Sequence, residues 1–205
     1  NMNFFAHKVP GTDSGDDEQK AARARALLVP FFMELDLGEV PEVVGTSPTF
    51  GEAVFEAVLA ARPRVVSFHF GLPEASMIAA LKNAGIVILS SATSVAEARY
   101  LEESGADAII TQSYEAGGHS GWFLPRGTAE VAGTMALVPR MVDAVNVPVI
   151  AAGGIADGRG IAAALTLGAA GVQIGTAFLA TPECMASQTH KNALLSASGD
   201  DTMMC

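Results

Sequence analysis

The sequence predicts an α/β fold in which helices cover a parallel β-sheet. Short, continuously apolar runs alternate with helical stretches of about 10 to 12 residues, which is the pattern of buried parallel strands joined by helices. A weak internal repeat supports this fold, because a glycine closes a helix and a buried strand follows within a few residues at Gly85, Gly105 and Gly168. At 205 residues, the chain is predicted to form a single domain over its whole length, 1–205.

Composition narrows the classes of function. The chain carries a formal net charge of −10 without any cluster of Lys and Arg, so a nucleic-acid partner is not expected. No apolar run reaches the roughly 18 residues of a membrane span, so we expect no membrane partner either. Cys184 and Cys205 show no CxxC or His-rich spacing, which predicts neither a disulfide framework nor a zinc site and favours the cytoplasm.

The first part of the chain predicts a strand followed by a long helix. An apolar run predicts the strand over 1–6. Acidic residues followed by an alanine-rich run predict a helix from Asp16 or Asp17. We expect Pro30 to interrupt or kink this helix before it continues toward Gly38.

The remainder of the chain alternates strands with helices. Thr49 is a suitable N-cap for a helix that ends near Ala61, and Thr93 or Ser94 caps a later helix. The strands predicted from apolar runs are 65–70, 86–90, 108–112, 147–152 and 172–175. The helices predicted between and after them are 74–84, 95–104, 134–145, 158–167 and a helical tail from residue 182.

Glycine turns decide between two architectures. The predicted strands are about six, two fewer than in a closed (β/α)8 TIM barrel, and an open doubly wound sheet could also use six. No early strand–GxGxxG–helix unit is present, which disfavours the open sheet. Glycine turns follow predicted strands at Gly117–Gly118, Gly153–Gly154 and Gly175–Thr176. In a barrel the last two are the loops after the last two strands, where phosphates commonly bind, and the first lies next to them. We therefore predict a partial TIM barrel.

His119 follows the first glycine turn and is the side chain there that can exchange a proton near neutral pH. The alternative for this stretch is a plain turn with a surface histidine. His69 lies in a strand, so it points either into the barrel mouth or into the helix layer. Gln112 and Gln173 are amides in apolar strands, and they either pair with each other or bind a heterocycle. The sequence has no pair of Asp or Glu residues at a strand end, so it indicates neither a glycosidase nor a metal site. Ser120 does not lie in a G-x-S-x-G motif, so a serine hydrolase is not expected.

Five sequence motifs, taken together, carry a resemblance to one known family. The longest are QSYEAGGHSG from Gln112, VPVIAAGGIADGR from Val147 and GVQIGT from Gly171. Shorter ones are NFFAH from Asn3 and VSFHFGLP from Val66. Together they resemble the nitronate monooxygenases, FMN-dependent TIM-barrel enzymes once called 2-nitropropane dioxygenases, along essentially the whole chain.

The resemblance implies roles for individual residues. His119 would be the catalytic histidine beside the flavin and the substrate, and His69 would contact the substrate. FMN would be the cofactor, with its phosphate held by Gly154 and the turn Gln173–Thr176. The full set of implied cofactor-binding residues is Asn3, Gln112, Gly117, Gly118, Gly153, Gly154, Gln173, Ile174, Gly175 and Thr176.

The activity that the resemblance implies is FMN-dependent oxidation of alkyl nitronates, or of neutral nitroalkanes, with oxygen to carbonyl compounds and nitrite. The expected partners are therefore a small nitronate and oxygen. One alternative is an FMN-dependent NAD(P)H reductase of the enoyl-acyl-carrier-protein or quinone type. Another is a barrel fragment without catalysis.

Family members are longer at both ends, so we expect the chain to be truncated, with two strand–helix units missing. A parallel sheet of six strands would leave two unpaired edges and an open barrel interior. We therefore expect the chain to bind FMN weakly, or only as a homo-oligomer that covers those edges.

Overall fold

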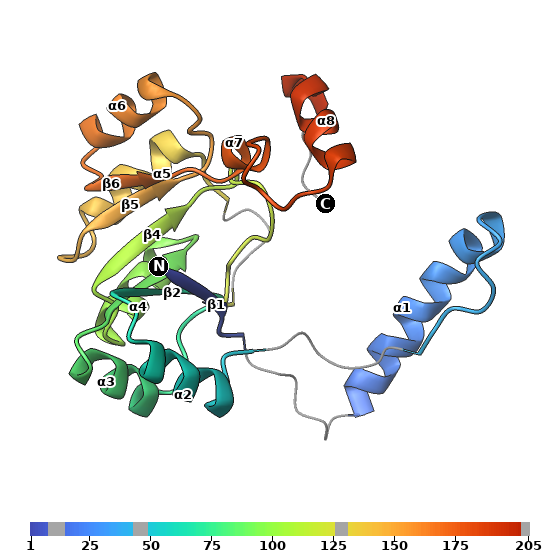
Figure 1. The fold of residues 1–205 in the computed structure, drawn as a ribbon, viewed down its shortest axis with the longest axis horizontal. Coiled ribbons are helices and arrows are strands. Elements are labelled where there is room, and N and C mark those ends of the chain that lie inside the picture. The colour runs from blue at the N-terminus through green and yellow to red at the C-terminus, as the bar shows by residue number, and fades with distance from the viewer. Residues whose placement is uncertain (8–14, 43–48, 126–130, 202–205) are drawn as a thin grey trace. The chain divides into compact units, whose positions relative to one another are not determined.

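The computed structural model describes residues 1–7, 15–42, 49–125 and 131–201 (Figure 1). It divides into two compact units. The smaller unit is Lys8–Thr49, and the larger unit combines Asn1–His7 with Phe50–Cys205. Within the ranges described, no helix is long and apolar enough to cross a membrane.

The larger unit is built on one parallel sheet of six strands in the order β1-β2-β3-β4-β5-β6. Each strand pairs with the next strand along the chain, which is the topology of a (β/α) barrel, and all carboxyl ends lie at one edge. The predicted α/β fold with a partial barrel is confirmed. The strands are β1 (Met2–Phe5), β2 (Val65–His69), β3 (Val87–Ala92), β4 (Ala108–Gln112), β5 (Val149–Ala152) and β6 (Gly171–Gln173).

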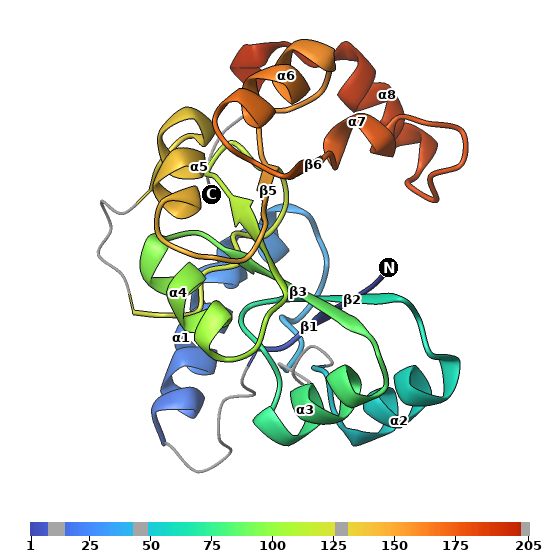
Figure 2. The same cartoon turned by 90° about the vertical axis from the view of Figure 1, so that its left-hand side faces the viewer.

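Helices cover the outside of the curved sheet (Figure 2). α3 to α6 each pack against one or two strands, so the opposite face of the sheet is left for the site. The helices are α1 (Gly15–Glu34), α2 (Glu52–Ala61), α3 (Ala75–Asn83), α4 (Val95–Glu103), α5 (Thr134–Val142), α6 (Gly158–Thr166), α7 (Thr176–Leu179) and α8 (Gln188–Ser196), with a short 3-10 turn at Gly199–Asp201.

The core of the larger unit lies between the helices and the sheet. It consists of three apolar clusters that follow the order of the strands. Burial of these aliphatic and aromatic side chains supplies the main favourable free energy of folding. Representative fully buried members are Val66, Ile88 and Leu81 in the first cluster, Ile109, Leu101 and Met141 in the second, and Val138, Ala151 and Ala164 in the third.

Two details of the predicted helices need correction. Thr49 is not the N-cap of α2, because the cap is Gly51, which makes no side-chain hydrogen bond to the helix. Of the two effects expected of Pro30, interruption is wrong, because α1 continues past it to Glu34, whereas a kink stays a prediction. Proline removes one donor and crowds the preceding turn, and here the chain stays helical around it. Ser94 does cap α4, accepting from the N–H of Glu97 as predicted.

The smaller unit is held together by contacts between α1 and the segment that follows it. Arg25 donates from Nη2 to the carbonyl oxygen of Val40 at 3.1 Å and lies 4.0 Å from the carboxylate of Glu42. Val40 is buried, whereas Phe31 and Met33 of α1 are exposed. None of the residues predicted to function lies in this unit.

Candidate functional site

Three glycine turns meet at the carboxyl edge of the sheet. A Cβ on Gly117 would lie 2.9 Å from Oγ1 of Thr176, so the loop after β4 touches the turn after β6. A Cβ on Gly153 would overlap the hydroxyl of Ser113 and lie 2.8 Å from the amide of Ala116. The loop after β4 therefore lies against both later turns, at distances that only glycine permits.

A polar network joins the loop after β4 to the start of α5. Thr134 donates from Oγ1 to the carbonyl oxygen of Gly153 at 2.7 Å, and its N–H donates to Oε2 of Glu115 at 2.6 Å. The hydroxyls of Thr134 and Ser113 lie 2.8 Å apart, and the N–H of Glu115 donates to Ser113. The Glu115 carboxylate thus lies at a helix N-terminus, where the helix dipole favours negative charge.

Gln112 holds the turn that carries His119. Its Nε2 donates to the main-chain oxygen of His119 at 2.8 Å, and its Oε1 accepts from the N–H of Gly121 at 2.7 Å. Both ends of the amide are therefore used on this turn, and not on Gln173 as one alternative had it. Gln173 is exposed.

His69 points toward the same turn and not into the helix layer. Its Nδ1 lies 2.5 Å from Oγ of Ser91, and its Nε2 lies 3.1 Å from the main-chain oxygen of His119. Its ring packs against Gly121, where any Cβ would overlap the imidazole. Burial lowers the pKa of His69 below its ordinary value, and the charge of His119 lowers it further, while the hydrogen bond to His119 opposes both.

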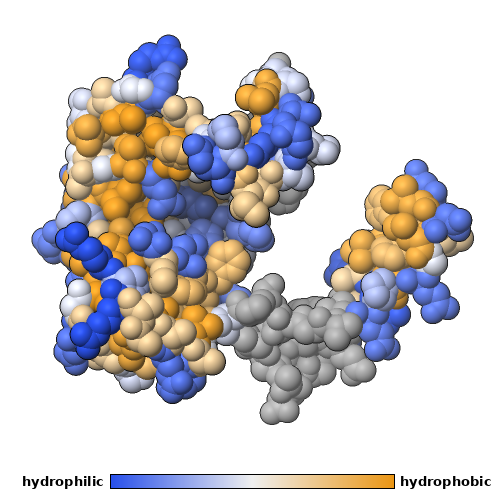
Figure 3. All heavy atoms as spheres, in the orientation of Figure 1, coloured by the Kyte–Doolittle hydropathy of each residue, from blue (hydrophilic) through white to orange (hydrophobic). Residues whose placement is uncertain are grey.

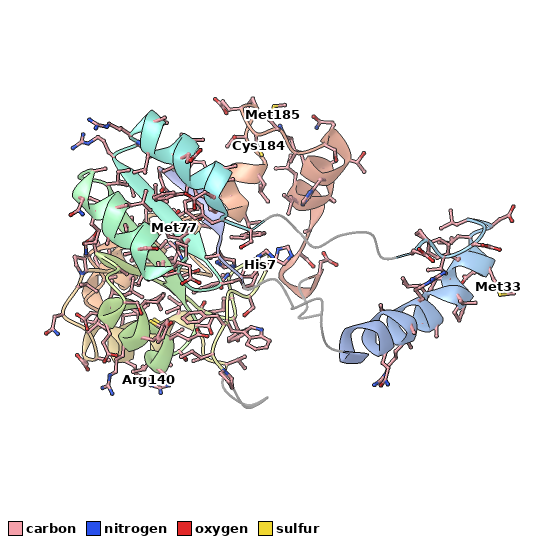
Figure 4. All side chains as sticks on the ribbon, turned by 90° about the horizontal axis from the view of Figure 1, so that it is seen from below. His7, Met33, Met77, Arg140, Cys184 and Met185 are labelled. Carbon is pink, nitrogen blue, oxygen red and sulfur yellow. The ribbon has the colours of Figure 1, made fainter. Side chains whose placement is uncertain are left out.

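His119 projects beside two aromatic rings. The centroids of its ring and the Phe5 ring are 5.9 Å apart, and those of its ring and the Phe70 ring are 6.2 Å apart. Phe70 adopts a positive φ of 68°, which is a strained backbone conformation for a bulky residue. His7, which is labelled in Figure 4, lies at the end of the described N-terminal segment. Its ring is a third one in this group, with centroids 6.4 Å from the Phe5 ring and 6.2 Å from the Phe70 ring.

The predicted site residues other than Gly118 line two adjoining cavities of about 500 and 490 Å³. Figure 3 shows this region as a hollow with hydrophilic residues inside it. Both cavities are lined by His69, Gln112, Gly117 and Gln173. The first cavity is also lined by Asn3, His119 and Ile174, and the second by Gly153, Gly154, Gly175 and Thr176. Gly118 lines neither, although its positive φ of 85° shapes the turn before His119.

The charges around the cavities are few. Among the residues that the structure describes, neither lining includes a Lys or Arg, and the one carboxylate that lines the cavities is that of Glu115, beside Gly154. The N-terminus of α6 is also occupied, because the side chain of Asp157 accepts from the N–H groups of Arg159 and Gly160. In the part of the chain that the structure covers, no group of three or more His, Cys, Asp or Glu could hold a metal ion.

One buried carboxylate supports the segment that follows the His119 turn. Oε1 of Glu97, on α4, accepts from the N–H groups of Phe123 and Leu124 at 2.7 and 3.1 Å. Its Oε2 accepts from the N–H and the hydroxyl of Thr93, both at 2.8 Å. Glu97 is 1% exposed, so four hydrogen bonds compensate the burial of its charge.

Sequence reasoning did not single out Ser91, Ser113, Glu115, Thr134 or Glu97. Glu115 could have been noticed as the acidic residue directly before the glycine pair. Each of the others has at least one partner far away in the sequence, such as His69 for Ser91, Phe123 for Glu97 and Thr134 for Ser113, and no local pattern reveals such a partner.

The chain is similar to known proteins along most of its length. A sequence profile of the family described as "Nitronate monooxygenase" matches residues 37–205. The chain is 43% identical over 199 residues to a nitronate monooxygenase of Paraburkholderia phytofirmans, covering 95% of this chain and 53% of that protein. It is 43% identical over 197 residues to a probable nitronate monooxygenase of Staphylococcus aureus, covering 96% and 55%. The chain thus spans about half the length of the curated relatives it matches.

Solved structures agree with this result. The fold is similar to that of nitroalkane oxidase from Streptomyces ansochromogenes, with a TM-score of 0.80 and 37% identity, covering 93% of this chain and 53% of that one. It is also similar to FabK from Thermotoga maritima, with a TM-score of 0.61 and 38% identity, covering 71% and 43%.

Proposed function

Because the chain belongs to the nitronate monooxygenase family, we propose that it takes part in the FMN-dependent oxidation of alkyl nitronates. In that reaction oxygen completes the conversion of the nitronate to a carbonyl compound and nitrite. The observation that carries the proposal is the meeting of His119 with three glycine turns around two adjoining cavities at the carboxyl edge of the sheet. Active sites of TIM barrels lie at this edge.

The residues present fit a flavin mononucleotide in shape and in donors. Each cavity falls within the roughly 300–1,000 Å³ of small-molecule sites. Main chain without side chains lines the second cavity at Gly153, Gly154 and Gly175, so its amide groups are accessible to a ligand. The hydroxyl of Thr176 adds a hydrogen-bond donor. Within the described ranges no Lys or Arg lines this cavity, so the groups placed there that would hold a phosphate are neutral.

We assign the phosphate to Gly154 and the turn Gln173–Thr176, with Gly153 shaping the approach. The flat ring would lie along Gln112 and Gly117, which line both cavities, with Asn3 at the far side of the first. Asn3 is oriented by Ser67, whose hydroxyl donates to its Oδ1 at 2.8 Å. The remaining predicted residue, Gly118, would shape the turn before His119.

A flavin held by these residues would supply the redox chemistry, as the acceptor of the substrate's electrons, and the protein would supply orientation and electrostatics. His119 lines the first cavity, and a ring nitrogen of its imidazole is the group we assign to orient an anionic nitronate. Where a neutral nitroalkane is the substrate, the same nitrogen would accept its α-proton. Phe5 and His69 line the same cavity and would limit the space for the alkyl group.

The test is aerobic release of nitrite from propyl-2-nitronate by FMN-reconstituted protein. Removal of an orienting acid–base group costs roughly 100-fold or more, so His119→Ala should lose most of the rate. His190→Ala, the same change on exposed helix α8, should keep it. Equal rates for His119→Ala and the unchanged protein would remove His119 from the mechanism.

Neutral nitroalkanes are a second candidate substrate class, favoured by the similarity to the nitroalkane oxidase structure. Nitrite release from 2-nitropropane, kept neutral by fresh preparation, would support it. Anaerobic mixing of the FMN-reconstituted protein with NADH distinguishes a monooxygenase from a reductase. Rapid bleaching of the yellow flavin colour would favour the reductase. Absence of yellow colour after purification with added FMN would favour a non-catalytic chain.

A further inference from the structure

Ser91 faces His69 from the neighbouring strand. Phe68 pairs with Ser90 in the register of β2 and β3, so the next residues, His69 and Ser91, follow side by side. The hydroxyl of Ser91 lies 2.5 Å from Nδ1 of His69. Both residues line both cavities.

The partners of His69 define where its ring carries a proton. The main-chain oxygen of His119 can only accept, so Nε2 must donate to it. The lowered pKa of His69 favours the neutral ring near pH 7, in which Nδ1 has no hydrogen. Nδ1 is then an acceptor, and the hydroxyl of Ser91 must be its donor.

Ser91 has little alternative for its hydrogen. The carbonyl oxygen of Phe68 is 3.4 Å from its hydroxyl, which is long for a hydrogen bond between oxygens. Ser91 is 4% exposed, so solvent has little access to the hydroxyl. The short contact to His69 is therefore its main hydrogen bond.

The main chain of His119 depends on this arrangement. Its oxygen accepts from two side chains, Nε2 of His69 at 3.1 Å and Nε2 of Gln112 at 2.8 Å. His69 also packs its ring against Gly121, two residues further along the same turn. A change of tautomer or a rotation of this ring would weaken one of the two hydrogen bonds and press on the turn.

We propose that Ser91 is a positioning residue for His119, acting through the ring of His69. Ser91 donates to Nδ1, this bond keeps the hydrogen of His69 on Nε2, and Nε2 holds the main chain from which His119 projects. The role in catalysis rests on the proposed function, whereas the effect of Ser91 on His69 does not.

The experiment reads the tautomer of His69 directly by nitrogen-15 NMR of the imidazoles. The chain has four histidines, and the signal of His69 is assigned with His69→Gln. The unchanged protein should show His69 with its hydrogen on Nε2 at pH 7.5. Ser91→Ala should show a mixture of tautomers, and Ser91→Thr, which keeps the hydroxyl, should restore the original signal.

Ser90→Ala is the matched control. Ser90 is a serine on the same strand with no exposed surface, and its hydroxyl donates to the carbonyl oxygen of Gly71 at 2.9 Å. This variant should leave the His69 signal unchanged. If Ser91→Ala does not fold, Ser91→Cys has a similar volume and a weaker donor, and it should show the same mixed signal.

Nitrite release supplies the second readout. Loss of one hydrogen bond in the chain should lower kcat about three- to tenfold in Ser91→Ala, with KM changed less than about twofold. A pure Nε2–H signal in Ser91→Ala or Ser91→Cys, or an unchanged kcat, would overturn the proposal. If the unchanged protein releases no nitrite, the proposed function fails, and the NMR signal still decides whether Ser91 sets the state of His69.

Discussion

Gly121 has no side chain, and the ring of His69 occupies the place where one would stand. Gly121 also donates its N–H to Oε1 of Gln112. The main chain of Gly121 is therefore fixed on one side by Gln112, while the imidazole of His69 fills the other side. Any larger residue must displace either the ring or the turn. Because His69 also contacts the main chain of His119, displacement at Gly121 reaches the proposed catalytic residue.

Gly121→Ala should therefore lower the rate of nitrite release roughly 10- to 100-fold, as expected for misplacement of a reacting group by about 1 Å. Gly158→Ala is a suitable control, because a Cβ there meets no atom within 4 Å. The measurement is kcat on propyl-2-nitronate for both variants. A rate for Gly121→Ala equal to that of Gly158→Ala would contradict the argument.

His69 also makes the stability of the fold depend on pH. Its pKa in the folded state lies below the ordinary value of 6.5. As the pH falls through 6.5, the unfolded chain binds a proton before the folded chain does, so the free energy of unfolding falls. The loss is complete once the pH is below the lowered pKa of the folded state.

The thermal midpoint of the protein should therefore decrease as the pH is lowered from 7.5 to 5.5, and His69→Gln should reduce that decrease. Glutamine has no proton to gain in this range, and its amide can still donate to the main chain of His119. Circular dichroism melts at several pH values provide the comparison. An identical pH slope in the two proteins would show that His69 titrates alike in the folded and unfolded chains.

At the scale of secondary-structure elements, α4 anchors the segment that follows the His119 turn. The anchor is Glu97, whose two oxygens accept from Thr93 at the helix N-terminus and from the main chain of Phe123 and Leu124. These donors have few alternatives if the carboxylate is removed. The helix and the loop therefore depend on one side chain.

Glu97→Ala should lower the free energy of unfolding by about 3 kcal/mol, because it leaves the buried donors of Thr93 and the half-buried N–H groups of Phe123 and Leu124 without this acceptor. Glu97→Gln keeps one acceptor oxygen and should cost about 1 kcal/mol. Glu103→Ala, on the exposed side of the same helix, should change it by less than about 0.5 kcal/mol. Denaturant titration measures all three, and similar values for Glu97→Ala and Glu103→Ala would refute the anchor.

Local patterns predicted most elements because buried strands and helix ends carry strong signals. β4 has the predicted bounds 108–112, since a run of apolar residues is enclosed by a glycine-led turn and a polar residue. The Ser94 cap could be predicted because a serine directly precedes a helix that has Glu97 in its first turn. The effect of Pro30 on α1 could not be predicted in the same way. A proline lowers the stability of a helix, but its presence does not determine whether the helix ends there.

The candidate site was predictable only in part. Glycines after strand ends identified the turns, and barrel topology brought them together. The roles of Gln112 and His69 on the His119 turn were not predictable, because their partners depend on side-chain directions across the sheet. The assignment of individual residues to flavin and substrate remains a prediction.

At the scale of the whole molecule, the larger unit contains its own core and all residues assigned to the site. The chain leaves this unit after β1 and returns at Phe50, whose N–H donates to the carbonyl oxygen of Phe5 at 2.9 Å. The smaller unit is thus an insertion between two adjacent points of the fold. The predicted single domain and a homo-oligomer that covers the outer strands both remain predictions, and light scattering with flavin absorbance would test the latter.

The described linings of the two cavities contain no Lys or Arg, and this affects how a substrate would arrive. The chain carries a net charge of −10, and Glu115 adds a carboxylate at the cavity itself. An anionic nitronate diffusing toward the site is therefore repelled over a distance set by the ionic strength, about 30 Å at 0.01 M salt and about 8 Å at 0.15 M. Encounter should be slowest in dilute buffer.

We expect kcat/KM for propyl-2-nitronate to rise a few-fold between these two salt concentrations, opposite to the usual effect for an oppositely charged enzyme and substrate. A neutral nitroalkane of the same size should show no such rise. If both substrates respond alike, the salt acts on the protein and not on the approach of the anion. Turnover in this site would then be limited by chemistry or release, and the acidic surface would serve solubility alone.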